Sequence, residues 1–305
     1  MTIIGTRGSP LALAQTELVI AALCALHPGA TFETRRITTR GDQIQDRPLS
    51  QVGGKGLFVK EIEEALLSGA IDMAVHSLKD LPAEQPAGLV IAAYPERADP
   101  RDVLVSRDGR PLAELAAGAR VGTSSLRRSV QLQALRPDIE VANIRGNVDT
   151  RLRKLDEGQY DAIVVAAAGL DRLGLHDRAT EFFEPAFFLP APGQGALAVE
   201  VRAGAAEMLA LLGALDHGPT RVTVEAERAF LQRLEGGCAV PFAAHARLDG
   251  DVLTLRGMLA DEDGGNMVVA STRGPASRAR RLGHDLADDV RALQEEDRVA
   301  GVSFY

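Results

Sequence analysis

The sequence predicts an α/β protein built from more than one domain. Short apolar strands alternate with helices through most of the chain, which is the pattern of α/β domains. With 305 residues, the chain is longer than one hydrophobic core usually organises, so two or three domains are expected. Near the C-terminus the pattern changes to three alternating strands and one helix, which is typical of a small α+β domain.

The first domain is predicted to open with a strand followed by a helix. Thr2–Thr6 has the apolar character of a short strand, and Ser9 before Pro10 favours the start of a helix. The sequence His27-Pro28-Gly29 ends that helix. Further strands are expected at residues 32–38, 71–75 and 89–94, with a helix at 57–67.

The same rhythm resumes after the proline-flanked segment 95–100, which predicts a second α/β domain. Strands are expected at residues 103–106, 120–122, 140–143 and 162–167, with helices at 126–135 and 148–155. A Pro/Gly-rich crossing at 189–193 leads to a helix at 220–234, strands at 242–248, 252–259 and 267–272, and a helix from 276 to about 293. We expect domain 1 to comprise residues 1–95 and 196–215, domain 2 residues 96–195, and domain 3 residues 216–305.

Composition excludes several classes of function. A hydrophobic share of 46% and a charged share of 25% are ordinary for a folded globular protein. The formal charge of -8 argues against general nucleic-acid binding. Apolar stretches are too short to span a bilayer, and no basic segment precedes the first strand, so neither a membrane segment nor an export signal is expected. Two widely separated cysteines, Cys24 and Cys238, favour a reducing compartment and therefore the cytoplasm.

Basic residues concentrate between Arg120 and Lys154, a segment with eight basic and only three acidic residues. Arg127 and Arg128 fall in the first turn of a predicted helix, just after the polar run at residues 122–125. Backbone N–H groups, hydroxyls and guanidinium groups would converge there, which suits a carboxylate or phosphate. A capped helix with solvated arginines is the alternative. Because Arg145 and Arg151 repeat the arrangement one βα unit later, we favour a polyanion site.

Asp80 lies just beyond the carboxyl end of a predicted buried strand, where open α/β sheets place ligand groups. From position alone, a turn-forming aspartate that pairs with Lys79 or caps a backbone amide is an equally good interpretation. A carboxylate among arginines would stay ionised, however, and could stabilise a cationic intermediate. His76, which lies in the same segment, is interpreted as a structural residue rather than a base.

Cys238 follows Gly236-Gly237 and precedes Pro241, so we expect it on a loop that a bulky group can approach closely. A thiol there could attack an electrophilic carbon and remain as a thioether. A buried structural cysteine is the competing interpretation. It is applied to Cys24, and for Cys238 both interpretations stay open.

Two other kinds of site are rejected. Gly193-Gln194-Gly195 is not a dinucleotide motif, because it follows Pro-Ala-Pro rather than a strand, and the spacing of His, Cys and carboxylates suggests no metal site.

Six segments together resemble the hydroxymethylbilane synthase (porphobilinogen deaminase) family. They are residues 4–13 (IGTRGSPLAL), 75–82 (VHSLKDLP), 122–128 (GTSSLRR), 144–155 (IRGNVDTRLRKL), 190–200 (PAPGQGALAVE) and 235–241 (EGGCAVP). They occur in the family's order from the N-terminus to the third domain. Ala14 and Ala239 are small departures that affect no functional position.

The resemblance implies two doubly wound α/β domains similar to type II periplasmic binding proteins, with the active cleft between them, and a third domain that carries the cysteine. It implies a transferase that extends a dipyrromethane cofactor, held on Cys238 as a thioether, by four porphobilinogen molecules joined head to tail with loss of ammonia. Water then releases the linear tetrapyrrole hydroxymethylbilane. The implied enzyme is a cytoplasmic monomer of tetrapyrrole and haem biosynthesis.

The resemblance also assigns roles residue by residue, with Asp80 as the catalytic group. The residues implied to bind the cofactor are Cys238, Lys79, Asp80, Thr123, Ser125, Arg127, Arg128 and Arg145. Those implied to bind substrate are Arg7, Ser9, Lys55, Ser77, Arg151 and Arg172, with Gln15 as a weaker candidate. Arg127→Leu or Arg128→Leu is therefore expected to block cofactor assembly or chain growth while leaving the fold intact.

A non-catalytic two-domain protein that binds an organic anion is the competing class. The first 215 or so residues support it on pattern alone. The absent export signal and the Gly-Gly-Cys loop of the third domain count against it.

Overall fold

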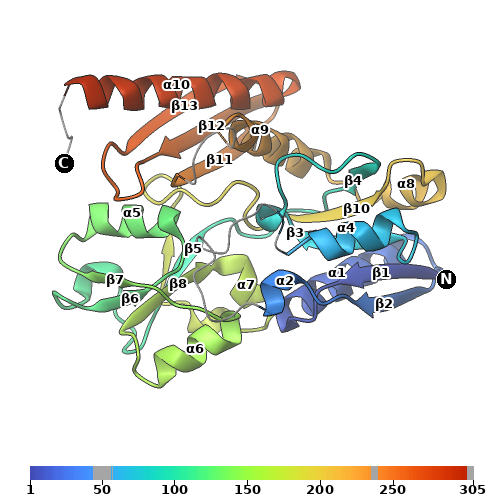
Figure 1. The fold of residues 1–305 in the computed structure, drawn as a ribbon, viewed down its shortest axis with the longest axis horizontal. Coiled ribbons are helices and arrows are strands. Elements are labelled where there is room, and N and C mark those ends of the chain that lie inside the picture. The colour runs from blue at the N-terminus through green and yellow to red at the C-terminus, as the bar shows by residue number, and fades with distance from the viewer. Residues whose placement is uncertain (44–55, 57, 235–239, 301–305) are drawn as a thin grey trace. The chain divides into compact units, whose positions relative to one another are not determined.

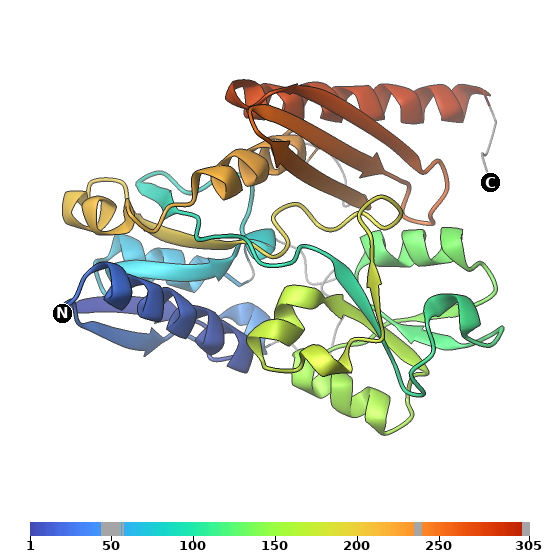
Figure 2. The ribbon, with the colours of Figure 1, turned by 180° about the vertical axis from the view of Figure 1, so that it is seen from behind.

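The computed structural model describes residues 1–43, 56, 58–234 and 240–300 of the chain, drawn from opposite sides in Figures 1 and 2. The chain forms two compact units, each assembled from two separate stretches. Unit 1 comprises Met1–Ala98 and Gly195–Arg221, and unit 2 comprises Asp99–Gln194 and Val222–Tyr305. The finer division into three domains remains a prediction.

Unit 1 is a mixed five-stranded sheet covered by helices on both faces. Its elements are β1 (Thr2–Thr6), α1 (Pro10–Leu26), β2 (Phe32–Arg36), α2 (Arg40–Gln43), α4 (Lys60–Leu67), β3 (Met73–Ser77), the 3-10 helix η1 (Leu78–Asp80), β4 (Leu89–Ala93), β10 (Leu197–Arg202) and α8 (Ala206–Leu212). The strand order is β2-β1-β3-β10-β4. Strands β1, β2 and β3 are parallel, whereas β10 runs antiparallel to β3 and β4.

The alternation of side chains along each strand divides the core of unit 1 between the two faces. Met73 and Val75 of β3 pack with Val19 and Leu23 of α1 on one face, to which α8 also contributes. On the other face Ala74 packs with residues of α4. Figure 1 shows α1 and α4 running alongside these strands. This period-two pattern is what a strand buried on both faces requires.

The larger sheet of unit 2 has the same construction. Its elements are β5 (Asp102–Ser106), η2 (Leu112–Glu114), β6 (Arg120–Gly122), α5 (Leu126–Leu135), β7 (Glu140–Ala142), α6 (Val148–Asp156), β8 (Ala162–Ala166), α7 (Ala167–Arg172), η3 (His176–Arg178) and β9 (Glu181–Phe183). The strand order is β7-β6-β8-β5-β9, with β6, β7 and β8 parallel and β5 antiparallel to both of its neighbours. Leu132 of α5 packs on one face and Leu152 of α6 on the other.

The C-terminal part of unit 2 is a three-stranded antiparallel sheet with two helices. Its elements are α9 (Gly218–Leu234), β11 (Phe242–Asp249), β12 (Val252–Leu259), β13 (Val268–Pro275), η4 (Ala276–Arg278) and α10 (Ala279–Ala300). Figure 2 shows α10 lying along the three strands. Phe230 of α9 and Leu286 of α10 are fully buried against the sheet. Gly257 of β12 allows this close packing, because a Cβ there would lie 2.5 Å from the Phe230 ring.

The predicted α/β class with a small C-terminal α+β part is confirmed, and most predicted elements lie within a few residues of the observed ones. Strands β9 and β10 and helices α2, α7 and α8 have no counterpart in the prediction. The predicted helix start at Leu57 lies outside the described residues. Among the helices that the structure describes, none has the length and apolar character needed to cross a membrane.

Candidate functional site

In unit 1, the predicted site residues gather where two parallel strands end. β1 pairs with β3 in parallel, so the carboxyl ends of both strands lie at the same edge of the sheet. Arg7 and Ser9 follow β1, and Ser77, Lys79 and Asp80 end or follow β3. Lys55, the remaining predicted residue of this region, lies outside the described residues.

Contacts within unit 1 fix several of these side chains. Ser9 caps α1, because its Oγ accepts the Ala12 backbone N–H at 3.2 Å. Gln15, which is 4% exposed, donates from Nε2 to the Ser77 Oγ at 2.8 Å and so joins α1 to the end of β3. Two sequence-predicted residues that are 62 positions apart are therefore in direct contact.

Arg7 is held by a carboxylate and an aromatic ring. Its Nε donates to the Asp42 Oδ1 at 3.2 Å, and its guanidinium lies 4.2 Å from the centre of the Phe58 ring. Burial alone would raise the pKa of Asp42, but hydrogen bonds from Arg7 and Thr39 outweigh burial and lower it. Arg7 is thus fixed at the sheet edge with its charge balanced by Asp42.

Lys79 and Asp80 lie in η1 with exposed side chains. The turn begins where the Leu78 backbone N–H donates to the Ala196 carbonyl oxygen at 3.1 Å, and Leu78 itself is buried. A buried leucine therefore anchors the turn while the carboxylate of Asp80 is left accessible at the end of β3. This geometry suits a group that acts on a ligand.

In unit 2, the basic residues gather at the corresponding edge of the larger sheet. The parallel strands β6, β7 and β8 are followed by the predicted residues Thr123, Ser125, Arg127, Arg128, Arg145, Arg151 and Arg172. β5 runs the opposite way, and its first residue, Asp102, pairs with Ala166 at the end of β8. The antiparallel strand therefore brings a carboxylate to the edge where the arginines lie.

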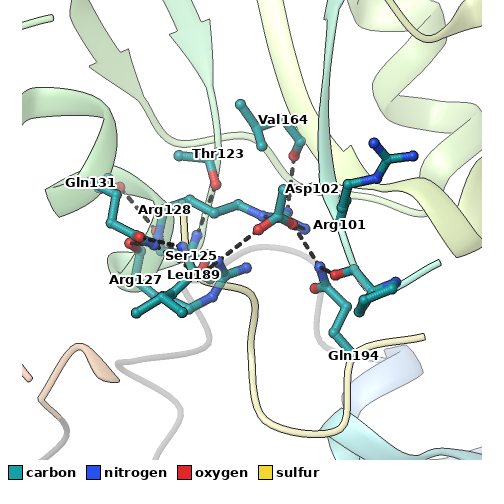
Figure 3. Close-up of polar contacts among 12 residues, drawn as sticks. Arg101, Asp102, Thr123, Ser125, Arg127, Arg128, Gln131, Val164, Leu189 and Gln194 are labelled. Carbon is teal, nitrogen blue, oxygen red and sulfur yellow. Dashed lines mark hydrogen bonds and ion pairs between the residues drawn. The ribbon is translucent and has the colours of Figure 1, made fainter. Parts of the chain in front are cut away.

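Asp102 binds both arginines of the helix start, as Figure 3 shows. Arg127 Nη1 donates to the Asp102 Oδ2 at 2.7 Å, and Arg128 donates to Oδ1 from Nε at 2.9 Å and from Nη2 at 2.6 Å. Asp102 is fully buried, and each arginine is 6% exposed. Arg127 also donates from Nη1 to the Leu189 carbonyl oxygen, and Arg128 from Nη1 to that of Val164.

These contacts change what replacement of the arginines should do. Burial on its own would raise the pKa of Asp102, but the charges of Arg127 and Arg128 hold it well below its ordinary value. Removing either arginine leaves a buried carboxylate with less compensation, which typically costs a few kcal/mol. The expectation that Arg127→Leu or Arg128→Leu leaves the fold intact therefore disagrees with this geometry, because both side chains are also internal supports.

The arginine pair retains capacity for a ligand. A guanidinium has five N–H donors, and the described contacts use two of those on Arg127 and three of those on Arg128. With Asp102, the two arginines form a trio that carries one net positive charge. Ser125 caps α5 by accepting the Arg128 backbone N–H at 3.4 Å, and Thr123 Oγ1 accepts that of Ser125 at 3.2 Å. The start of the helix is therefore rigid, polar and cationic.

The other predicted arginines of unit 2 differ in their surroundings. Within the described chain, Arg145 has two buried guanidinium nitrogens, Nε and Nη2, without a hydrogen-bond partner. Arg151 donates from Nε to the Gly146 carbonyl oxygen at 2.9 Å. Burial lowers the pKa of Arg172 to about 10, although the negative charge of Asp171 acts to raise it. Buried, unpartnered N–H groups are costly, so Arg145 fits a site that an anionic group completes.

Sequence reasoning missed three buried polar residues that support this edge. The first is Asp102. The second is Gln194, which donates from Nε2 to the Asp102 Oδ1 at 3.0 Å and to the Pro100 carbonyl oxygen at 2.8 Å. Gln131, one turn along α5, exchanges hydrogen bonds with the Leu189 backbone. A signal for Asp102 existed, since an acidic residue at the start of an apolar strand needs a buried partner.

Cys238 lies outside the described residues. Helix α9 ends at Leu234, four residues before it. Within the described part of the chain, no group of three His, Cys, Asp or Glu side chains could hold a metal ion.

Comparison with known proteins assigns the chain to a family. The model described as "Porphobilinogen deaminase, dipyromethane cofactor binding domain" matches residues 2–210, and "Porphobilinogen deaminase, C-terminal domain" matches residues 221–292. The chain belongs to the porphobilinogen deaminase family. All candidate residues from Arg7 to Arg172 lie in the part that matches the family's cofactor-binding domain.

Two related proteins, at 58% and 56% identity, agree with the family assignment. The porphobilinogen deaminase of Roseiflexus sp. (strain RS-1) is 58% identical over 94% of this chain and 95% of its own length. That of Syntrophobacter fumaroxidans (strain DSM 10017 / MPOB) is 56% identical over 94% of this chain and 93% of its own. Among solved structures, a YaeC family lipoprotein from Enterococcus faecalis V583 is similar over 70% of this chain and 90% of its own, with 16% identity and a TM-score of 0.43.

Proposed function

We propose that this member of the porphobilinogen deaminase family is a hydroxymethylbilane synthase, which condenses four porphobilinogen molecules head to tail with release of ammonia. Growth would take place on a dipyrromethane group bound to Cys238, followed by hydrolysis to linear hydroxymethylbilane. The observation that carries the proposal is the trio of Asp102, Arg127 and Arg128, a buried cationic cluster at the carboxyl edge of a sheet.

The cationic edge of unit 2 suits the acetate and propionate groups of pyrroles. Arg127 and Arg128 keep about half of their N–H donors for a ligand, and the trio keeps one positive charge. Arg145 adds two buried N–H groups that need an acceptor. Guanidinium groups bind carboxylates through paired, charge-assisted hydrogen bonds, which supplies affinity and orientation together. The remaining predicted binding residues, Arg7, Ser9, Gln15, Ser77, Lys79, Arg151 and Arg172, keep this role as proposals.

Asp80 is proposed as the catalytic carboxylate. Its accessible side chain lies at the end of β3, on a turn that buried Leu78 fixes. A carboxylate held in place there can take up or return a proton and offset positive charge that develops on the pyrrole as ammonia leaves. Such fixed opposite charges act without reorganisation during the reaction, which is why they lower barriers.

Cys238 is proposed as the attachment point of the cofactor. When bound, the dipyrromethane group supplies the free pyrrole carbon on which the chain is extended. The arginine pair, Thr123, Ser125 and Arg145 would hold its carboxylates. We also propose that the enzyme acts as a cytoplasmic monomer, with three domains divided as the sequence predicts.

Intact-protein mass spectrometry tests the proposal and separates an enzyme from a simple anion-binding protein. The wild-type protein should be heavier than its sequence by one dipyrromethane unit. Cys24→Ala is the matched control. Cys24 is exposed on α1, so its interpretation from the sequence as a buried structural cysteine was wrong. This variant should keep the added mass, whereas Cys238→Ala should lose it. An active wild-type protein with unmodified mass, or an unchanged adduct on Cys238→Ala, would contradict the assignment.

A further inference from the structure

Asp102 has contacts that the proposed function does not yet explain. Its two oxygens accept hydrogen bonds from Arg127, Arg128 and Gln194, and its side chain is fully buried. A residue so enclosed by protein groups has no surface left for a ligand. Any contribution it makes to the reaction must therefore pass through the groups that it holds.

The geometry shows what those contacts do to the arginines. Arg127 donates twice from Nη1, to Asp102 and to the Leu189 carbonyl oxygen at 2.6 Å, so the plane of its guanidinium is fixed and Nε and Nη2 form its remaining edge. Arg128 is fixed from the other side by two bonds to Oδ1. A free arginine side chain would have to lose its rotamer freedom on binding, and this arrangement removes that cost in advance.

Asp102 also offsets the electrostatic repulsion between the two arginines. Arg127 and Arg128 are neighbours in the chain and both are buried, so their like charges repel in a poorly solvated environment. One carboxylate between them balances one charge and leaves the other for the ligand. Without it, one guanidinium would be driven towards solvent.

We propose that Asp102 is a positioning residue of the cofactor site: it holds Arg127 and Arg128 in the orientation that binds the carboxylates of the dipyrromethane group. This inference rests on the proposed role of the two arginines. Gln194 also supports Asp102, because its Nε2 bridges the Asp102 Oδ1 and the Pro100 carbonyl oxygen. The flanking Gly193 and Gly195 have positive φ of 73° and 85°, so this glycine-rich segment serves as the turn that presents Gln194.

The test compares Asp102→Asn with a control of similar structural cost. Asn keeps the shape of the side chain but removes its charge. Its NH₂ group would also face arginine N–H donors, with which it cannot form a hydrogen bond. Leu132→Ala is the control, because Leu132 is fully buried on the same helix α5 but packs in the apolar core of the sheet. Apoprotein made in cells that lack porphobilinogen is incubated with porphobilinogen, and adduct formation is followed by intact mass. Urea titrations define conditions in which each variant is folded.

We expect Asp102→Asn to form the adduct roughly 30-fold more slowly or worse, the effect typical of losing one partner of a buried charge pair. Leu132→Ala should load at nearly the wild-type rate. If both variants load alike, Asp102 is only structural and the inference is overturned. If the wild-type protein forms no adduct, the proposed function fails as well, so the two failures are distinguishable.

A double-mutant cycle tests whether Asp102 acts through Arg127. When Arg127→Lys has already removed one oriented fork, Asp102→Asn should slow loading less than it does in the wild-type protein, because only Arg128 is then left to lose its position. Fully additive losses would overturn the inference. Should Asp102→Asn fail to fold, Gln194→Met decides, since it removes a support of the carboxylate without changing any charge. Several-fold slower loading supports the inference, and wild-type loading overturns it.

Discussion

Glu227 is the buried carboxylate whose removal the structure predicts to be most damaging to the C-terminal part of unit 2. It lies on α9 and is fully buried. Its Oε2 accepts the Gly193 backbone N–H at 2.7 Å, and its Oε1 accepts that of Ala246 in β11 at 2.8 Å. One side chain thus ties a helix, a sheet and the glycine-rich turn beside Gln194 together.

The magnitude follows from these two contacts. A hydrogen bond to a charged group contributes about 1.5–3 kcal/mol, and a buried N–H left without an acceptor costs a similar amount. Glu227→Ala removes both acceptors, so we expect the free energy of unfolding to fall by about 3–5 kcal/mol. Glu227→Gln keeps one carbonyl acceptor and should lose about half as much. Against a typical total of about 5–15 kcal/mol, either loss is easily measured.

Urea titration followed by circular dichroism provides the assay, with Arg233→Ala as the control on the same helix. Arg233 forms an ion pair with Asp288, but both side chains are about half exposed, at 53% and 49%. Exposed pairs contribute at most about 1 kcal/mol, so this variant should unfold almost as the wild-type protein does. If Glu227→Ala is no more destabilising than Arg233→Ala, the two hydrogen bonds of Glu227 contribute little to the free energy of unfolding.

Three further variants test other parts of the molecule. Asp80→Asn should lower turnover by about 10²–10³-fold without changing the melting temperature, since the side chain is exposed, and Asp80→Glu should retain more activity; steady-state assays and thermal melts check both. Gly283→Ala should destabilise the chain by about 1–3 kcal/mol in urea titrations, because a Cβ there would overlap the Ala226 carbonyl oxygen of α9. Burial and the charge of Glu200 raise the pKa of Glu63, so ionising it costs stability as the pH rises through that raised pKa. Glu63→Gln should therefore gain stability relative to wild type between about pH 4 and about pH 7, and an unchanged difference across that range would exclude the effect.

Much of the fold could be predicted because local chemistry and tertiary structure agree. Ser9 and Pro10 start α1 where capping rules place it, and the turn at Asp249-Gly250-Asp251 joins two strands as its residues favour. The position of Arg127 and Arg128 in the first turn of α5 also followed from the sequence. These features depend on neighbours within a few residues.

What the sequence did not reveal depends on contacts between distant segments. Strand β10 carries Glu200 in its middle, and an acidic residue there does not indicate a buried strand. In the structure Glu200 is buried with His76 of β3, whose Nε2 lies 3.2 Å from the Glu200 Oε2. Asp102 lies just before the strand predicted at residues 103–106, and its partners Arg127 and Arg128 are 25 and 26 residues away along the chain. Only the reversed direction of β5 brings its first residue to the arginines.

The position of β10 determines the order in which the chain can fold during synthesis. This strand lies between β3 and β4 in the sheet of unit 1, yet it begins at Leu197, about one hundred residues after β4 ends. A ribosome adds roughly 5–20 residues per second, so β4 waits on the order of 5–20 seconds for its neighbour. The sheet formed by β5–β9 is encoded entirely within that interval and can close first. Until β10 emerges, β3 and β4 expose strand edges that could pair with other nascent chains. The N-terminal end of this protein is therefore made first but completed late, and chaperones that cover strand edges would act there.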